Sequence, residues 1–272
     1  MPPPNILTDP IALQSRRRRA TDAGDFLHRL AIDEIEDRLG SVNKSFTAPA
    51  VVTGWPEIWR DVLPTARIVP DDETLQLQVG QHDLLIHAMS LHWANDPVGQ
   101  LIQSRRALRP DGLFLGVCYA GQTLNELRRC LGEAEAAITG GLSPRVAPMA
   151  DLRDWGGLLQ RAGLALPVAD SVTTRVEYDD LHALMRDLRA MGETNALAAR
   201  LRRPTLRAVM DRAAELYAAH FPGQHKAITA TFEMVFLAGW APDATQPKPL
   251  RPGSAQQRLA DALGTQEKPL SD

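Results

Sequence analysis

Polar and aromatic side chains stand directly after two of the predicted strands. His92 and Trp93 follow a buried strand predicted at residues 83–88. Ligands of open α/β sheets bind beyond the carboxyl ends of the strands, so His92 is a candidate general base. The alternative is that Trp93 packs beneath a loop while His92 makes only a local hydrogen bond. Tyr119 and Asn125 follow a later strand and either line the same cleft or contribute to packing.

Other motifs for metal binding or nucleophilic catalysis are missing from the sequence. No Cys, His or acidic residue at metal-ligand spacing accompanies His92, and we predict no metal ion. Ser143 lies in Gly-Leu-Ser-Pro, and Arg145 stands where a nucleophile elbow needs its second glycine. Ser143 is therefore interpreted as a turn residue. Cys118 and Cys130 form no Cys-x-x-Cys pair, and Cys118 is predicted to be a small core residue in a reducing compartment.

The elements that position these residues alternate between strands and helices. Short apolar runs predict strands, and apolar residues at helical spacing predict helices. The predicted strands are residues 50–52, 66–69, 83–88, 113–117, 164–168, 173–178 and 229–240, and the predicted helices between them are residues 57–63, 97–108, 123–131, 151–161, 180–190 and 206–221. This alternation predicts one α/β domain with a mostly parallel sheet. We expect residues 229–240 to form an antiparallel edge strand.

Composition limits the classes of function. The chain has 272 residues, of which 44% are hydrophobic and 23% charged, and its net charge is −3. Such a balance argues against a general nucleic-acid binder, which needs a basic excess. No segment is long and apolar enough to span a bilayer, and the first residues lack a signal-peptide core, so we expect a cytoplasmic protein. The predicted organisation is an N-terminal arm (1–24, extended over residues 1–15), a domain (25–240) and a C-terminal tail (241–272).

Several segments resemble a known family. SLHWANDP at 90–97 and LRPDGLF at 108–114 resemble the fourth and fifth strand regions of class I S-adenosylmethionine-dependent methyltransferases. More narrowly, they resemble the branch that contains malonyl-carrier-protein methyltransferases and the methyltransferase-like assembly factor 5 of respiratory complex I. Further similarity to the assembly factors lies in GQTLNELR at 121–128, GLSPRVAP at 141–148, LRAMGETN at 188–195, the arginine run at 16–19 and RPGS at 251–254.

The expected cofactor loop departs from that family. The family's first strand leads into an acidic residue and a glycine-rich turn, because glycines let the backbone approach the ligand closely. Here Gly54 is the one glycine, Trp55 and Pro56 follow it, and no acidic residue precedes it. Pro56 also offers no N–H donor. The sequence therefore predicts a degenerate Rossmann-like fold with a damaged cofactor loop.

The chain is also too short in this region for the complete fold. Only 37 positions separate Ala50 from His87, whereas one βαβ unit takes about 30 residues or more. We therefore expect at least one βα unit to be shortened or lost. Asp71 and Asp72 resemble the segment that carries the family's adenine-contacting acid. The alternative is that both are solvated turn residues.

The resemblance implies a cofactor site, and the departures argue against its use. The candidate cofactor residues are Gly54, Asp71, Asp72, His92 and Trp93. We expect no bound cofactor, with S-adenosylmethionine as the ligand only if the site is retained. His92 is the sole catalytic candidate.

Two functions compete at this point. The first is a methyltransferase-like assembly factor or accessory subunit without methyltransferase activity, which docks onto the peripheral arm of respiratory NADH:ubiquinone oxidoreductase (complex I), on the cytoplasmic face of the membrane. Arg16, Arg17, Arg18, Arg19 and Arg251 are its candidate partner-binding residues, since guanidinium groups pair with acidic surfaces. The second is an active methyltransferase acting on a carboxylate, carrier-protein or protein side-chain substrate. A binding module for an unrelated small ligand is a third alternative.

Overall fold

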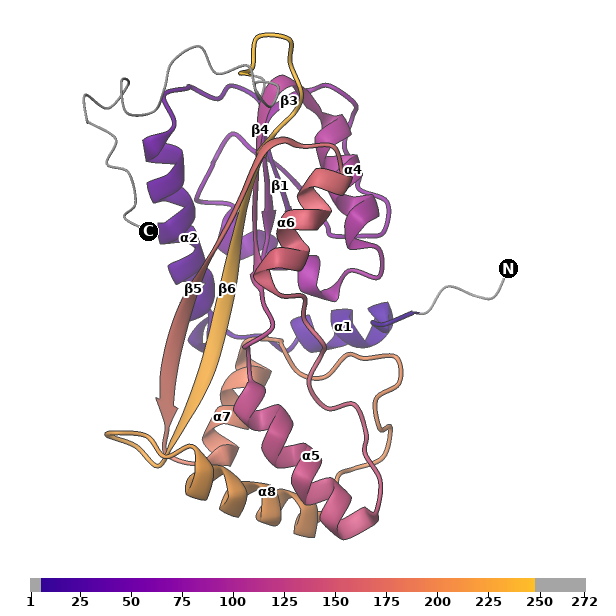
Figure 1. Ribbon diagram of the computed structural model, residues 1–272, viewed down its shortest axis with the longest axis vertical. Coiled ribbons are helices and arrows are strands. Elements are labelled where there is room, and N and C mark those ends of the chain that lie inside the picture. The colour runs from indigo at the N-terminus through magenta and orange to yellow at the C-terminus, as the bar shows by residue number, and fades with distance from the viewer. Residues whose placement is uncertain (1–5, 248–272) are drawn as a thin grey trace, which may run out of the picture. The chain divides into compact units, whose positions relative to one another are not determined.

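A computed structural model describes residues 6–247, and its elements alternate between strands and helices as the sequence patterns predict (Figure 1). The strands are β1 (Pro49–Thr53), β2 (Arg67–Val69), β3 (His82–Ala88), β4 (Leu108–Tyr119), β5 (Ala165–Tyr178) and β6 (Ile228–Trp240). The α-helices are α1 (Pro10–Arg17), α2 (Phe26–Ser41), α3 (Pro56–Trp59), α4 (Pro97–Ala107), α5 (Asn125–Thr139), α6 (Leu152–Arg161), α7 (Leu181–Ala190) and α8 (Arg207–His220). Two short 3₁₀ helices are η1 (Asp22–Gly24) and η2 (Leu91–Trp93). All of these elements belong to one compact unit, which ends at Pro242.

The six strands form one sheet in the order β2-β1-β3-β4-β6-β5. β1, β2, β3 and β4 pair in parallel, and β6 runs antiparallel to both of its neighbours. This arrangement confirms the predicted mostly parallel sheet with one reversed strand. The reversed strand lies one place inside the edge, because β5 pairs along its whole outer side. β5 is one continuous strand where the sequence predicted two.

The region between β1 and β3 is shortened, as predicted. It contains only β2, which has three residues, and α3, which has four. The helix predicted at residues 57–63 therefore ends early, at Trp59. Trp59 is fully buried against α2, and its indole N–H donates to Nδ1 of His28 at 3.2 Å. Trp59 thus packs the shortened region onto α2.

Helices cover both faces of the sheet (Figure 1). Successive strand residues alternate between two apolar clusters because side chains of a strand point to opposite faces. Val51 and Ile86 contribute to the cluster covered by α2, α5, α7 and α8, whereas Leu85 and Cys118 contribute to the cluster covered by α4 and α6. Cys118 is a free, buried thiol, which confirms its predicted place in the core.

The N-terminal segment differs from the extended conformation predicted for residues 1–15. Residues 10–17 form the helix α1, with Asp9 accepting a hydrogen bond from the Ala12 N–H as its N-cap and Pro10 at the first helical position. Both features are typical of helix starts. The Thr8 N–H donates to Asn95, and Asp9 pairs with Arg200 at 2.9 Å. These contacts hold α1 beyond the carboxyl end of β1 (Figure 1).

Candidate functional site

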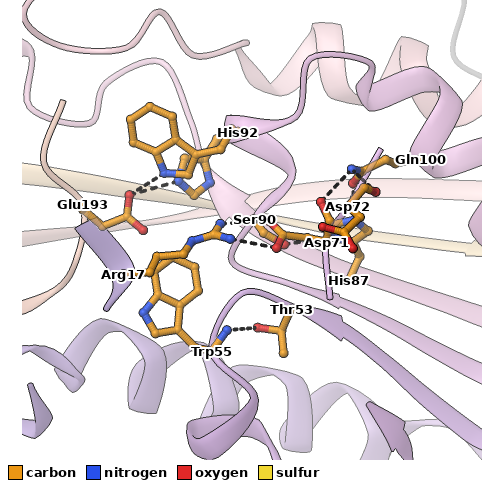
Figure 2. A network of polar contacts seen from close by, with 11 residues as sticks. Arg17, Thr53, Trp55, Asp71, Asp72, His87, Ser90, His92, Gln100 and Glu193 are labelled. Carbon is orange, nitrogen blue, oxygen red and sulfur yellow. Dashed lines mark hydrogen bonds and ion pairs between the residues drawn. The ribbon is translucent and has the colours of Figure 1, made fainter. Parts of the chain in front are cut away.

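The carboxyl ends of β1 and β2 are bridged by the side chain of Arg17, from the last turn of α1. Its two terminal nitrogens donate to the two carboxylate oxygens of Asp71 at 2.7 and 2.8 Å. Both side chains are only 12% exposed. A bidentate arginine–carboxylate pair is the most directional ion pair available to proteins. Arg17 therefore links the segments that follow β1 and β2, and Figure 2 shows its contact with Asp71.

The guanidinium group also occupies the space beside the single glycine of the expected cofactor loop. A β-carbon added to Gly54 would lie 2.1 Å from Nη1 of Arg17. On its other side the guanidinium lies over the indole of Trp55, 4.3 Å from the ring centroid. Such cation–π contacts add about 0.5–2 kcal/mol. The absence of a side chain at Gly54 thus leaves room for the Arg17 guanidinium, whereas the family's glycines leave room for the cofactor.

Arg17 determines the charge state of Asp71. Burial raises the pKa of the Asp71 carboxyl, but the charge and hydrogen bonds of Arg17 outweigh burial, and the net pKa is lowered. The pair is therefore ionised at neutral pH. Asp72, by contrast, is exposed, and its carbonyl accepts a hydrogen bond from Gln100.

A buried imidazole supports the loop that carries Asp71. His87 at the end of β3 lies 2.7 Å from Oε1 of Gln100, while the Gln100 amide donates to the carbonyls of Asp71 and Asp72 at 3.2 Å. Since that amide nitrogen is used as a donor, the proton on His87 belongs on Nε2. Burial lowers the pKa of His87 to about 4, against a smaller opposing effect of Gln100. His87 is thus a neutral, structural histidine.

The other predicted residues, His92 and Trp93, lie on η2. Figure 2 shows His92 beside Glu193. The Trp93 indole N–H donates to Oε2 of Glu193 at 2.7 Å, and His92 Nε2 lies 3.3 Å from the same oxygen. Burial raises the pKa of Glu193, but His92, Arg17 and the Trp93 hydrogen bond outweigh it, and the net pKa is lowered. His92 also packs edge-on against Tyr119 at 4.8 Å between ring centroids.

A cleft of about 970 Å³ adjoins the Arg17–Asp71 pair. It is lined by Gly54 and Asp71 from the sheet edge, by Arg17 from α1 and by Trp93 from η2. The structure therefore brings four of the five cofactor candidates, Gly54, Asp71, Asp72 and Trp93, to one cleft. It places His92 behind this lining, against Glu193.

The arginine run divides into buried and exposed members. Arg17 points into the chain and pairs with Asp71, and its side chain is only 12% exposed, so its assignment to a partner stays a prediction that would require this pair to open. Arg16 is half-buried, whereas Arg18 and Arg19 are exposed. Arg251 lies outside the described residues. The assignment of Arg16, Arg18 and Arg19 to a partner stays a prediction.

The sequence analysis missed the central residues of this network. Glu193 lies within the segment that resembles the assembly factors, and Arg17 lies within the arginine run, so both stood in notable motifs. Neither motif indicated the contact, because Arg17 and Asp71 lie 54 positions apart and Trp93 and Glu193 lie 100 apart. Only the fold brings these pairs together.

S-adenosylmethionine, which the fold implies, does not fit these residues. The guanidinium of Arg17 fills the space beside Gly54, Pro56 removes a backbone donor, and both oxygens of Asp71 are engaged by Arg17.

No cluster of three or more potential metal ligands occurs within residues 6–247. None of the helices in the same range is long and apolar enough to cross a membrane.

Comparison with known proteins agrees with the resemblance seen in the sequence. No family model matches the chain. It is 36% identical over 202 residues to a Danio rerio protein named arginine-hydroxylase NDUFAF5, mitochondrial, covering 73% of this chain and 62% of the relative. It is 35% identical over 188 residues to malonyl-[acyl-carrier protein] O-methyltransferase of Laribacter hongkongensis, covering 69% and 61%. The chain thus spans less than two thirds of the length of these curated relatives.

A solved structure supports the same fold. A methyltransferase candidate from Bacillus halodurans superimposes with a TM-score of 0.50 at 11% identity, covering 78% of this chain and 99% of that structure. Fold and sequence together define the class: the chain belongs to the class I S-adenosylmethionine-dependent methyltransferase superfamily. Within it, the chain is a relative of the NDUFAF5 arginine-hydroxylases and the malonyl-carrier-protein methyltransferases.

Proposed function

We propose that this protein is a methyltransferase-fold assembly factor of respiratory NADH:ubiquinone oxidoreductase that acts by binding rather than by methyl transfer. The observation that carries the non-catalytic role is the Arg17 side chain held between Gly54, Trp55 and Asp71. Similarity to the NDUFAF5 proteins over 202 residues supports the partner. Those relatives are named arginine-hydroxylases. We do not extend hydroxylation to this chain, because the Arg17 side chain occupies the space beside Gly54 in its cofactor cleft.

A second candidate is an active methyltransferase on a carboxylate, carrier-protein or protein side-chain substrate. The similarity to malonyl-carrier-protein O-methyltransferases favours it. In that case Arg17 must leave the cleft before the cofactor enters, and His92 is the candidate base. Because the Arg17–Asp71 pair is bidentate and largely buried, this movement costs free energy that cofactor binding must supply.

The partner and location follow from the first candidate. We assign partner contacts to the exposed Arg18 and Arg19 and, separately, to the tail from residue 241, which includes Arg251. An exposed ion pair contributes only about 0–1 kcal/mol, so these arginines orient the complex more than they hold it. The cytoplasmic location expected from the sequence stays a prediction, since the NDUFAF5 relatives are named mitochondrial.

The first expected result is the absence of S-adenosylmethionine binding at micromolar concentration. Isothermal titration of the full chain should give no saturable heat, because Arg17 and Pro56 exclude the ligand from the strand ends. A malonyl-carrier-protein O-methyltransferase titrated in parallel should bind and serves as the positive control. Saturable heat from this chain would contradict the non-catalytic role and favour the second candidate.

The second expected result is recovery of NADH dehydrogenase subunits from native membranes by the tagged full chain. Reversing two exposed charges with Arg18→Glu and Arg19→Glu should lower recovery several-fold by repelling an acidic partner surface. The matched control is Arg207→Glu with Arg212→Glu, two exposed arginines of α8. No recovery above background by the wild-type chain would overturn the assignment, and equal loss in both double variants would reject the role given to Arg18 and Arg19.

A further inference from the structure

A second cavity lies beside the cofactor cleft, on the other side of Trp93. Its volume is about 350 Å³, and it opens among the end of β4, the helices α5, α7 and α8, and the loop that follows α7. Figure 1 shows these three helices gathered beyond one end of the sheet. Ligand sites of proteins usually enclose about 300–1,000 Å³. The cavity is therefore of a size that suits one small ligand.

One part of the wall of this cavity is apolar. The side chains that form them come from β6, α5, α7, α8 and the turn before α5, and they include Leu124, Leu127, Leu131, Met185, Met210 and Phe232. Methionine is unbranched and flexible, so Met185 and Met210 can adapt to the shape of a bound chain. Such a lining favours a hydrocarbon group over a polar one.

The charges around the same cavity are strongly one-sided. Six arginines line it, namely Arg16, Arg19, Arg145, Arg189, Arg200 and Arg203, against the single carboxylate of Glu193. The carboxylate is engaged with Trp93 and His92. In a chain whose net charge is −3, this local excess of guanidinium groups favours an anion.

Most of these arginines have no acidic partner among the residues that the structure describes. Arg145 pairs with Glu135, and Arg200 pairs with Asp9. The other four, Arg16, Arg19, Arg189 and Arg203, make no ion pair within the described residues, and Nε of Arg16 is buried without a hydrogen-bond partner. They come from three separate segments of the chain, α1 with the turn after it, α7 and the loop before α8. Their convergence at one opening is therefore a feature of the fold rather than of one charged run.

We propose that this cavity binds a single-chain aliphatic carboxylate, such as a fatty acid anion, with its hydrocarbon chain between Met185, Met210 and Phe232 and its carboxylate on the unpaired arginines. The apolar walls select the chain, and the guanidinium groups select the charge. The volume of about 350 Å³ suits one chain rather than a two-chain lipid. This binding requires no cofactor; it shares Arg19 with the proposed partner contacts, and the Arg189 and Arg203 variants test it apart from those contacts.

The test is titration of the full chain with dodecanoate below its micelle concentration, followed by calorimetry. We expect saturable binding at one site and about fifteenfold weaker binding of decanoate, since each of the two methylenes removed costs about 0.8 kcal/mol, or roughly fourfold in affinity. Dodecanol, which has the same chain length and no charge, should bind at least tenfold more weakly than dodecanoate. No saturable binding of dodecanoate, or equal affinity for dodecanol, would overturn the proposal.

Variants locate the site. Met210→Trp should abolish binding, because Met210 lines the cavity and the larger indole fills it. Arg189→Gln with Arg203→Gln, both exposed and unpaired, should weaken dodecanoate about tenfold and leave dodecanol unchanged. The control, Arg207→Gln with Arg212→Gln, removes the same charge from α8 outside the cavity lining and should bind like the wild type. Undiminished binding by the Met210 and Arg189/Arg203 variants would place the ligand elsewhere and reject this site.

Two further probes, inorganic phosphate and phosphatidylglycerol vesicles, distinguish a free fatty acid anion from a simple inorganic anion and from a lipid headgroup in a membrane. Inorganic phosphate should bind at least a hundredfold more weakly than dodecanoate, because it gains nothing from the apolar walls. Vesicles of phosphatidylglycerol should not retain the chain on flotation, whereas a membrane-facing surface would. Retention on vesicles without binding of free dodecanoate would overturn the cavity proposal.

Discussion

Acidification from pH 7 to pH 5 should lower the free energy of unfolding by about 2 kcal/mol for each of two buried histidines, His28 and His87. Burial lowers the pKa of both imidazoles from 6.5 to about 4. The unfolded chain therefore takes up a proton near pH 6.5, and the folded chain does so only near pH 4. Stability is complete above pH 6.5 and is lost as the pH falls through this window. Small domains have a free energy of unfolding of only about 5–15 kcal/mol. The two losses together are therefore a large share of the total stability.

The surroundings of each imidazole explain why it stays neutral. His28 accepts a hydrogen bond from Trp59 through Nδ1 and packs against Trp55 at 4.8 Å between ring centroids. Burial is the largest cause of its lowered pKa; Glu193 and Asp25 raise that pKa, and Arg17 and His92 lower it. At His87, burial again has the largest effect on the pKa, while Asp71 raises it and Arg17 lowers it.

The measurement is urea unfolding at pH steps from 7 to 5, an interval above the ordinary pKa values of Asp71 and Glu193, 3.8 and 4.5. His28→Gln and His87→Gln should each remove about half of the pH-dependent loss, because glutamine retains a hydrogen-bonding side chain but does not titrate. His182→Gln, at an exposed position, is the control and should show the wild-type slope. A wild-type stability that stays constant over this interval would contradict the prediction.

The sequence predicted the strands well because their apolar runs are short and bounded by turn residues. Residues 83–88 and 113–117 lie within β3 and β4, and both are buried on the two faces of the sheet. The mostly parallel pairing followed from the alternation of strands and helices, and the shortened region before β3 followed from the shortage of residues between Ala50 and His87. The position of β6 inside the edge did not follow, because strand pairing depends on contacts that are distant in the sequence.

The candidate site was predicted only in part, for the same physical reason. Asp71 was expected to contact a ligand or solvent, since acidic side chains are seldom buried without a partner. Asp71 is indeed paired where it is buried, and its partner is Arg17, which the sequence analysis assigned to a contact with another protein. The segment before α2 has weak helical patterning, and α1 forms there because Asp9 and Pro10 start it and Asn95 and Arg200 hold its beginning.

Replacing Arg17 with methionine should lower the free energy of unfolding by about 3 kcal/mol at pH 7. Removal of one partner from a largely buried ion pair costs about 3–5 kcal/mol because the remaining charge is left without compensation. Because both side chains remain 12% exposed, we expect a cost at the lower end of this range. Loss of the contact with Trp55 adds to the cost. Urea unfolding of the variant and the wild type measures the difference.

Three further variants show whether the loss arises from the pair itself. Asp71→Asn should also destabilise, and the double variant with Arg17→Met should cost less than the sum of the two, because no unpaired charge remains. Arg17→Lys should lie between the wild type and Arg17→Met, since an ammonium group cannot form the bidentate contact. The pKa of Asp71 is lowered by Arg17, so the pair stabilises above pH 3.8 and its contribution is lost as the pH falls through the folded-state pKa. A deficit below about 1 kcal/mol for Arg17→Met, or one that stays unchanged down to pH 3, would show that Arg17 does not hold the strand ends together.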